Sequence, residues 1–76
     1  MFRYVIHTDN SPKIFKETCK RVKEIFPDAT EQKLLVDVDG STIQTFTQEG
    51  KDIDVFDDYD IGIVFVQSEI EIQHFN

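Results

Sequence analysis

The stretch SPKIFKETCKRVKEIFP, residues 11–27, decides the fold. Its apolar side chains recur at helical spacing, and Pro27 ends the pattern because the residue before a proline avoids the α region. Ser11 is a favoured N-cap residue, and Pro12 suits the first helical turn, where its missing N–H group is not needed. We therefore expect one helix over residues 12–26, whose core-facing side chains are Phe15, Cys19, Val22 and Phe26.

Strand patterns lie on both sides of this helix. Residues 2–8 are rich in aromatic and β-branched side chains, which is typical of a strand. After the helix, Asp39-Gly40 predicts a two-residue hairpin turn and Glu49-Gly50 predicts the next turn. The later strands are expected at residues 34–38, 42–48, 52–56 and 61–66. Whether residues 61–75 form one long strand or a hairpin stays open at this point.

The order of these elements, β-α-β-β-β-β, predicts an α+β fold. One N-terminal helix must pack on a mostly antiparallel sheet of about five strands, which gives a two-layer sandwich. The length of 76 residues allows a single domain spanning residues 1–76. One helix covers only part of such a sheet, so the other face must be polar, shortened by twist or buried against a partner.

Charge is distributed unevenly along the chain. The formal net charge is −7, with +2 in residues 1–36 and −9 in residues 37–76. Lysines form a ridge on the expected back of the helix, but the net negative field of the protein repels phosphate. We therefore expect no direct binding to DNA or RNA.

The acidic strand region is the candidate contact surface. Carboxylates that share one exposed sheet face would attract a basic protein and speed its encounter. The predicted function is a small, acidic, non-catalytic protein-interaction module that binds through this acidic β face. Reversal of Asp54, Asp57 and Asp58 to lysine is expected to abolish a salt-sensitive interaction without unfolding the domain. The residues predicted to contact a partner are Asp52, Asp54, Asp57, Asp58, Tyr59 and Asp60.

Two other functions are consistent with the same sequence. An acidic surface on a small protein also suits an inhibitor that mimics nucleic-acid phosphate and occupies the groove of a DNA- or RNA-binding enzyme. Alternatively, sheet edges or uncovered apolar faces join two copies in a structural homodimer. The partner is accordingly a basic protein or a second copy of this chain.

Catalytic and cofactor motifs are absent from the sequence. Cys19 lies on the apolar side of the expected helix, where a thiol is usually buried and inert, and neither His7 nor His74 is marked as its partner. The acidic run at residues 52–60 lacks the ligand spacing of an EF-hand calcium loop. We expect no enzyme activity, no cofactor and no metal ligands.

The short length of the hydrophobic segments leads us to expect a cytoplasmic protein. No run approaches the roughly 18 apolar residues of a membrane span, and the first apolar run is too short for the core of a signal peptide. The single cysteine excludes an intramolecular disulfide.

Overall fold

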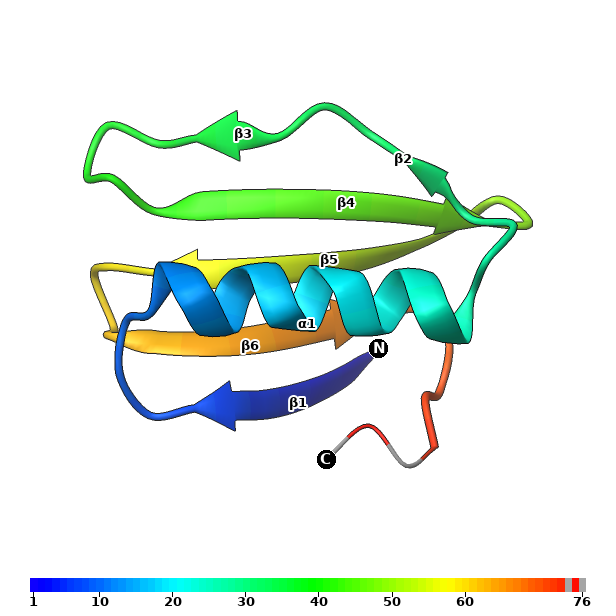
Figure 1. Cartoon of the computed structure of the whole chain (residues 1–76), viewed down its shortest axis with the longest axis horizontal. Helices are drawn as coiled ribbons and strands as arrows, with labels where there is room; N and C mark the ends of the chain where they lie inside the picture. The colour runs from blue at the N-terminus through cyan, green and yellow to red at the C-terminus, as the bar shows by residue number, and fades with distance from the viewer. Residues whose placement is uncertain (74, 76) are drawn as a thin grey trace.

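A computed structural model describes residues 1–73 and 75 of this α+β protein (Figure 1). One helix follows the first strand, and all later elements are strands, as the sequence predicts. The elements are β1 (Phe2–His7), α1 (Pro12–Ile25), β2 (Thr30–Glu31), β3 (Leu35–Val36), β4 (Thr42–Gln48), β5 (Lys51–Asp58) and β6 (Ile63–Ser68).

Helix α1 begins and ends where its capping residues indicate. The Ser11 hydroxyl accepts a hydrogen bond of 3.1 Å from the backbone N–H of Ile14, and Pro12 occupies the first turn. Phe26 is the C-cap, and its N–H donates to the carbonyl of Val22. The side chains that α1 buries are Phe15, Thr18 and Val22.

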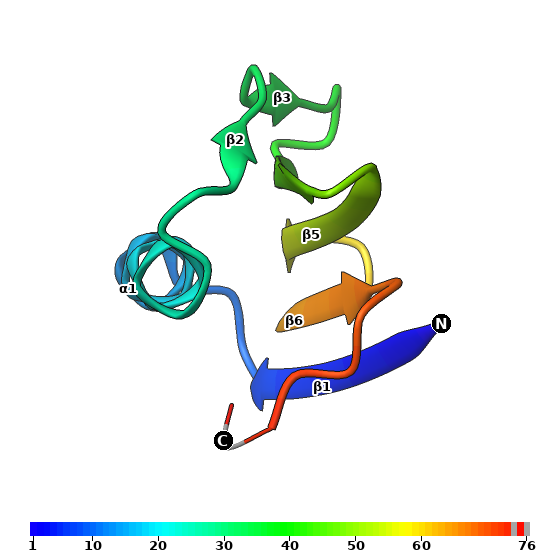
Figure 2. The same ribbon diagram turned by 90° about the vertical axis from the view of Figure 1, so that its right-hand side faces the viewer.

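The sheet is antiparallel throughout, with the strand order β1-β6-β5-β4-β2 and β3 also paired to β4. The first and last strands in sequence are therefore neighbours. Helix α1 packs on one face of the sheet, mainly over β5 and β4, and no helix among the described residues covers the other face (Figure 2). This second face is called the open face below.

The sheet has six strands rather than about five because the strand after the helix is divided. Gln32 donates its N–H to Thr45, but Leu35 already pairs with Ile43, so two residues of this strand oppose the single residue Gln44. This arrangement is a β-bulge. The Gln44 side chain turns back to donate to the carbonyl of Gln32 at the bulge. Strands β2 and β3 are the two halves on either side of it.

The turn predicted at Asp39-Gly40 is one residue longer than expected. Asp37 donates its N–H to the carbonyl of Ser41, which leaves a three-residue loop instead of two. Gly40 has a φ of 91°, the left-handed conformation in which such loops commonly end. At Glu49-Gly50 the predicted turn is confirmed, and it has two residues because Gln48 pairs directly with Lys51.

The segment after β6 is neither a longer strand nor a hairpin over the described residues. Strand β6 ends at Ser68, and Ile72 and Phe75 are buried against the core beside β1. The Tyr4 hydroxyl accepts a hydrogen bond of 2.8 Å from the N–H of Ile72, and the Tyr4 and Phe75 rings stack with centroids 5.7 Å apart. This segment thus completes the core that α1 leaves uncovered. No helix of the described residues is long and apolar enough to cross a membrane.

Candidate interaction surface

The six residues predicted to contact a partner are divided among three places in the structure. Asp57 points to the helix side of the sheet and is only 1% exposed. Its Oδ1 atom accepts hydrogen bonds from the side-chain amide of Asn10 at 3.2 Å and from the N–H of Ser11 at 3.3 Å. Asp57 therefore holds the start of α1 and offers no surface to a partner, so its reversal to lysine would disturb the helix.

Asp58, Tyr59 and Asp60 lie at the turn between β5 and β6. One carboxylate oxygen of Asp58 accepts from the N–H groups of Asp60 at 2.9 Å and Ile61 at 3.1 Å, so it stabilises the turn. Tyr59 is exposed, and its N–H donates to the hydroxyl of Ser41 at 2.8 Å. This turn is a second, separate acidic position.

Asp52 and Asp54 lie near the other end of β5, on the open face. Their side chains alternate with the buried Ile53, as the sequence predicts. The hydroxyls of Thr47 and Thr45 donate to Asp52 at 3.0 Å and to Asp54 at 2.7 Å, respectively. Six residues of extended strand, or roughly 20 Å, separate Asp52 from Asp58. The other residues of the predicted set therefore form two groups instead of one patch, and the buried Asp57 belongs to neither.

Between these two groups lies a row of apolar side chains that crosses the open face. The cross-strand pairs follow one another without a break, from β1 through β6, β5 and β4 to β3. Val5 and Leu35, at the ends of the row, are 51% and 55% exposed. This set, called the apolar row below, consists of Val5, Phe65, Phe56, Ile43 and Leu35.

The centre of the apolar row is already packed. Phe65 is 4% exposed although no helix covers it. The Phe56 ring stacks on Phe65 with centroids 4.5 Å apart, and the Arg3 guanidinium lies 4.8 Å from the centre of the Phe65 ring. Arg3 also donates to the side-chain carbonyl of Gln67 at 3.1 Å. These contacts give the open face a packed aromatic centre.

Acidic groups border the apolar row on both sides. Asp54 and Asp52 follow it toward one end of β5, and Asp58 follows it toward the other. The Glu69 carboxylate accepts from the N–H of Asp52 at 2.7 Å and so adds a third acidic group at the first end. The open face thus combines an apolar centre with a largely acidic rim, a pattern found in protein interfaces, which have apolar centres and polar rims.

Sequence reasoning missed the apolar row, although part of its signal was present. The unbroken apolar run at residues 61–66 predicts a strand that is apolar on both faces. The second face of this strand contributes Phe65 to the apolar row. The remaining members become neighbours only through the register of distant strands, which periodicity does not reveal.

Cys19 has the environment of a structural thiol. It packs against the core cluster from α1, and this burial, with a smaller effect of the Glu31 charge, raises the pKa of its thiol to about 12. A thiol with such a pKa is protonated at neutral pH and is a poor nucleophile. His7 is exposed at the end of β1, and His74 lies outside the described residues.

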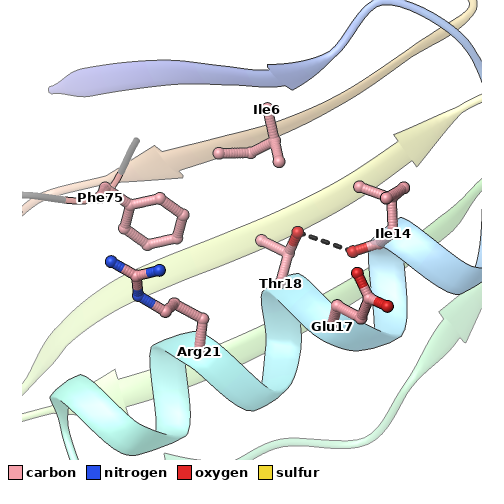
Figure 3. A pocket seen from close by; sticks show the side chains of 6 residues that line it. All are labelled: Ile6, Ile14, Glu17, Thr18, Arg21 and Phe75. Carbon is pink, nitrogen blue, oxygen red and sulfur yellow. Dashed lines mark hydrogen bonds between the residues drawn. The ribbon is translucent and has the colours of Figure 1, made fainter.

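A small cavity of about 230 Å³ opens between α1 and β1 (Figure 3). The Thr18 hydroxyl donates to the Ile14 carbonyl, and the Arg21 side chain extends toward the Phe75 ring. None of the six predicted contact residues lines this cavity. Its lining consists of Ile6, Ile14, Glu17, Thr18, Arg21 and Phe75.

Comparison with known proteins adds no relative. The chain matches no protein-family model, no curated protein and no solved structure. Within residues 1–73 and 75, no three His, Cys, Asp or Glu side chains lie close enough to hold a metal ion. The functional proposal therefore rests on the geometry of the open face.

Proposed function

We propose that this protein is a non-catalytic interaction module that binds a basic protein on the open face of its sheet. The observation that carries the proposal is the apolar row with its acidic border. The row offers the exposed side chains of Val5 and Leu35 for burial, on either side of the stacked Phe65 and Phe56 rings. Asp52, Asp54 and Asp58 supply charges that attract basic groups at the rim.

The charge on the helix side of the molecule supports binding of a basic partner at the open face. The back of α1 carries exposed lysines, whereas on the open face the Arg3 guanidinium is held over the Phe65 ring beside the apolar row. A basic partner is therefore attracted to the open face and not to the helix. We place the interaction in the cytoplasm, because a chain whose single cysteine is half-buried and free suits a reducing compartment. The exposed lysines on α1 are Lys13, Lys16 and Lys20.

Affinity capture from a native lysate tests the proposal with two matched charge variants. The first variant, Asp52→Lys with Asp54→Lys, changes the open face. The control, Glu24→Lys with Asp28→Lys, changes the net charge by the same amount at exposed positions near the end of α1. We expect wild type and control to retain one protein at low salt and to release it at high salt, while the face variant retains none. Equal retention by all three proteins would refute the assignment.

A second variant separates apolar burial from charge. Val5→Thr with Ile43→Thr keeps β-branched side chains but introduces a hydroxyl at each position. We expect this variant to lose binding at low salt as well, since apolar area along the row is needed. Unchanged binding would show that charge alone holds the partner. Competition for the captured protein by duplex DNA would then favour the phosphate-mimicking inhibitor.

A further inference from the structure

The edge of the sheet formed by β3 exposes apolar side chains that the chain itself does not cover. Every residue from 30 to 40 is exposed, including four large apolar ones, and Val36 is 66% exposed. In Figure 1 no other segment lies beyond β3 at this edge. Native proteins usually protect such an edge, because its unpaired groups can bind another strand. The exposed apolar residues here are Leu34, Leu35, Val36 and Val38.

The backbone of β3 is available for a further strand. Asp37 donates its N–H to Ser41 on the β4 side of the hairpin. In an antiparallel pair, successive residues direct their N–H and C=O groups to opposite sides of the strand. The N–H and C=O of Val36 therefore point away from β4, toward the free edge.

We propose that the β3 edges of two copies of this chain pair with each other, antiparallel, about a two-fold axis at Leu35. In this register Leu34 of one copy lies opposite Val36 of the other, and Leu35 lies opposite its own counterpart. Lys33 then lies opposite Asp37, twice in each dimer. This interface uses the sheet edge and shares only Leu35 with the apolar row, so the rest of the open face stays accessible.

The occupant is a second copy because the sequence of the edge is complementary to itself. Residues 33–37 read Lys-Leu-Leu-Val-Asp, with opposite charges at the two ends and apolar residues between them. Opposite charges directly across an antiparallel pair are favourable, and a two-fold interface requires one patch to match itself. A shift of the register by two residues would instead place Leu35 opposite Asp37.

The other edge of the sheet lacks this self-complementarity. Antiparallel pairing of two β1 strands about Val5 would set Arg3 against His7. The β3 edge is therefore the better surface for a dimer. One pair of short strands buries less than the roughly 1,200 Å² of a stable interface, so the dimer is weak.

Sedimentation equilibrium of the purified chain, at concentrations up to about 1 mM, tests the dimer by charge exchange. Lys33→Glu and Asp37→Lys each replace two attractions by two repulsions, and we expect each to raise the dissociation constant about tenfold. The double variant restores opposite charges across the pair, and we expect it to dimerise like wild type. The controls are Lys16→Glu and Asp28→Lys, which make the same charge changes at exposed positions elsewhere.

The double variant distinguishes edge pairing from a general effect of charge or folding. A thermal melt of each variant verifies that the domain is folded before its mass is measured. A wild type that stays monomeric at about 1 mM would overturn the proposal. Single variants that behave like their controls, or a double variant that does not recover, would overturn it as well.

Discussion

The Asp57 carboxylate lies 3.3 Å from the backbone nitrogen of Ser11, so the end of β5 is joined to the residue that caps α1. Asp57→Ala removes this buried acceptor and leaves two donors without it. We expect the free energy of unfolding to fall by about 1–3 kcal/mol. Asp57→Asn keeps one carbonyl oxygen and should cost less. Urea denaturation measures both, and Asp60→Ala, at an exposed position, should change stability by no more than about 0.5 kcal/mol.

Because Cys19 is partly buried, the free energy of unfolding depends on pH in the alkaline range. The pKa of its thiol is raised from an ordinary value of 9.0 to about 12, so the folded state binds this proton more tightly than the unfolded state. The resulting stability is complete below pH 9 and is lost as the pH rises toward 12. Denaturation of wild type and Cys19→Ala across this range should show their stabilities converging. A constant difference would contradict the buried thiol.

The turn at Glu49-Gly50 contains a correctable strain. Glu49 has a φ of 53°, in the left-handed backbone region that residues other than Gly and Asn rarely adopt. Glu49→Asn suits this type of hairpin turn and should raise the free energy of unfolding by about 0.5–1 kcal/mol. Glu71→Asn makes the same substitution at an exposed residue without positive φ and should not stabilise the protein. Thermal melts compare the two variants.

The hydrogen bond from the N–H of Ile72 to the Tyr4 hydroxyl ties the last part of the chain to β1. Tyr4→Phe keeps the ring that stacks on Phe75 but removes the acceptor. We expect a loss of about 0.5–1.5 kcal/mol and faster hydrogen exchange at the Ile72 amide. Tyr59→Phe, in an exposed ring, should change neither quantity. Equal exchange at Ile72 in wild type and Tyr4→Phe would show that the bond does not hold the segment.

Local pattern was sufficient for the helix and for most strands. Ser11, Pro12 and Pro27 mark the ends of the helix by their own backbone chemistry, which needs no information from the rest of the chain. The alternation along β5 also places Asp52 and Asp54 on one face of the strand and Ile53 on the other, which residue spacing alone indicates. The class of fold could be inferred from these elements alone.

The same alternation also predicts that Asp57 is buried, but the prediction grouped Asp57 with the aspartates around it. Asp57 is in phase with Ile53 and Val55, so a strand that continued past residue 56 had to direct its carboxylate toward the helix. The bulge between Gln32 and Leu35 was not predictable, because no residue there requires it locally. Pairing of β1 with β6 joins the two ends of the sequence, and spacing along the chain contains no information about it.

The lysines on the back of α1 and the aspartates of the open face give the molecule an electric dipole moment across the sheet. At physiological ionic strength the field of an exposed charge decays over about 8 Å, while even the shortest extent of the protein is 21 Å. A partner at the open face therefore experiences its carboxylates but not the lysines behind them. The two sides of this small protein can attract molecules of opposite charge at the same time, and salt weakens each attraction separately.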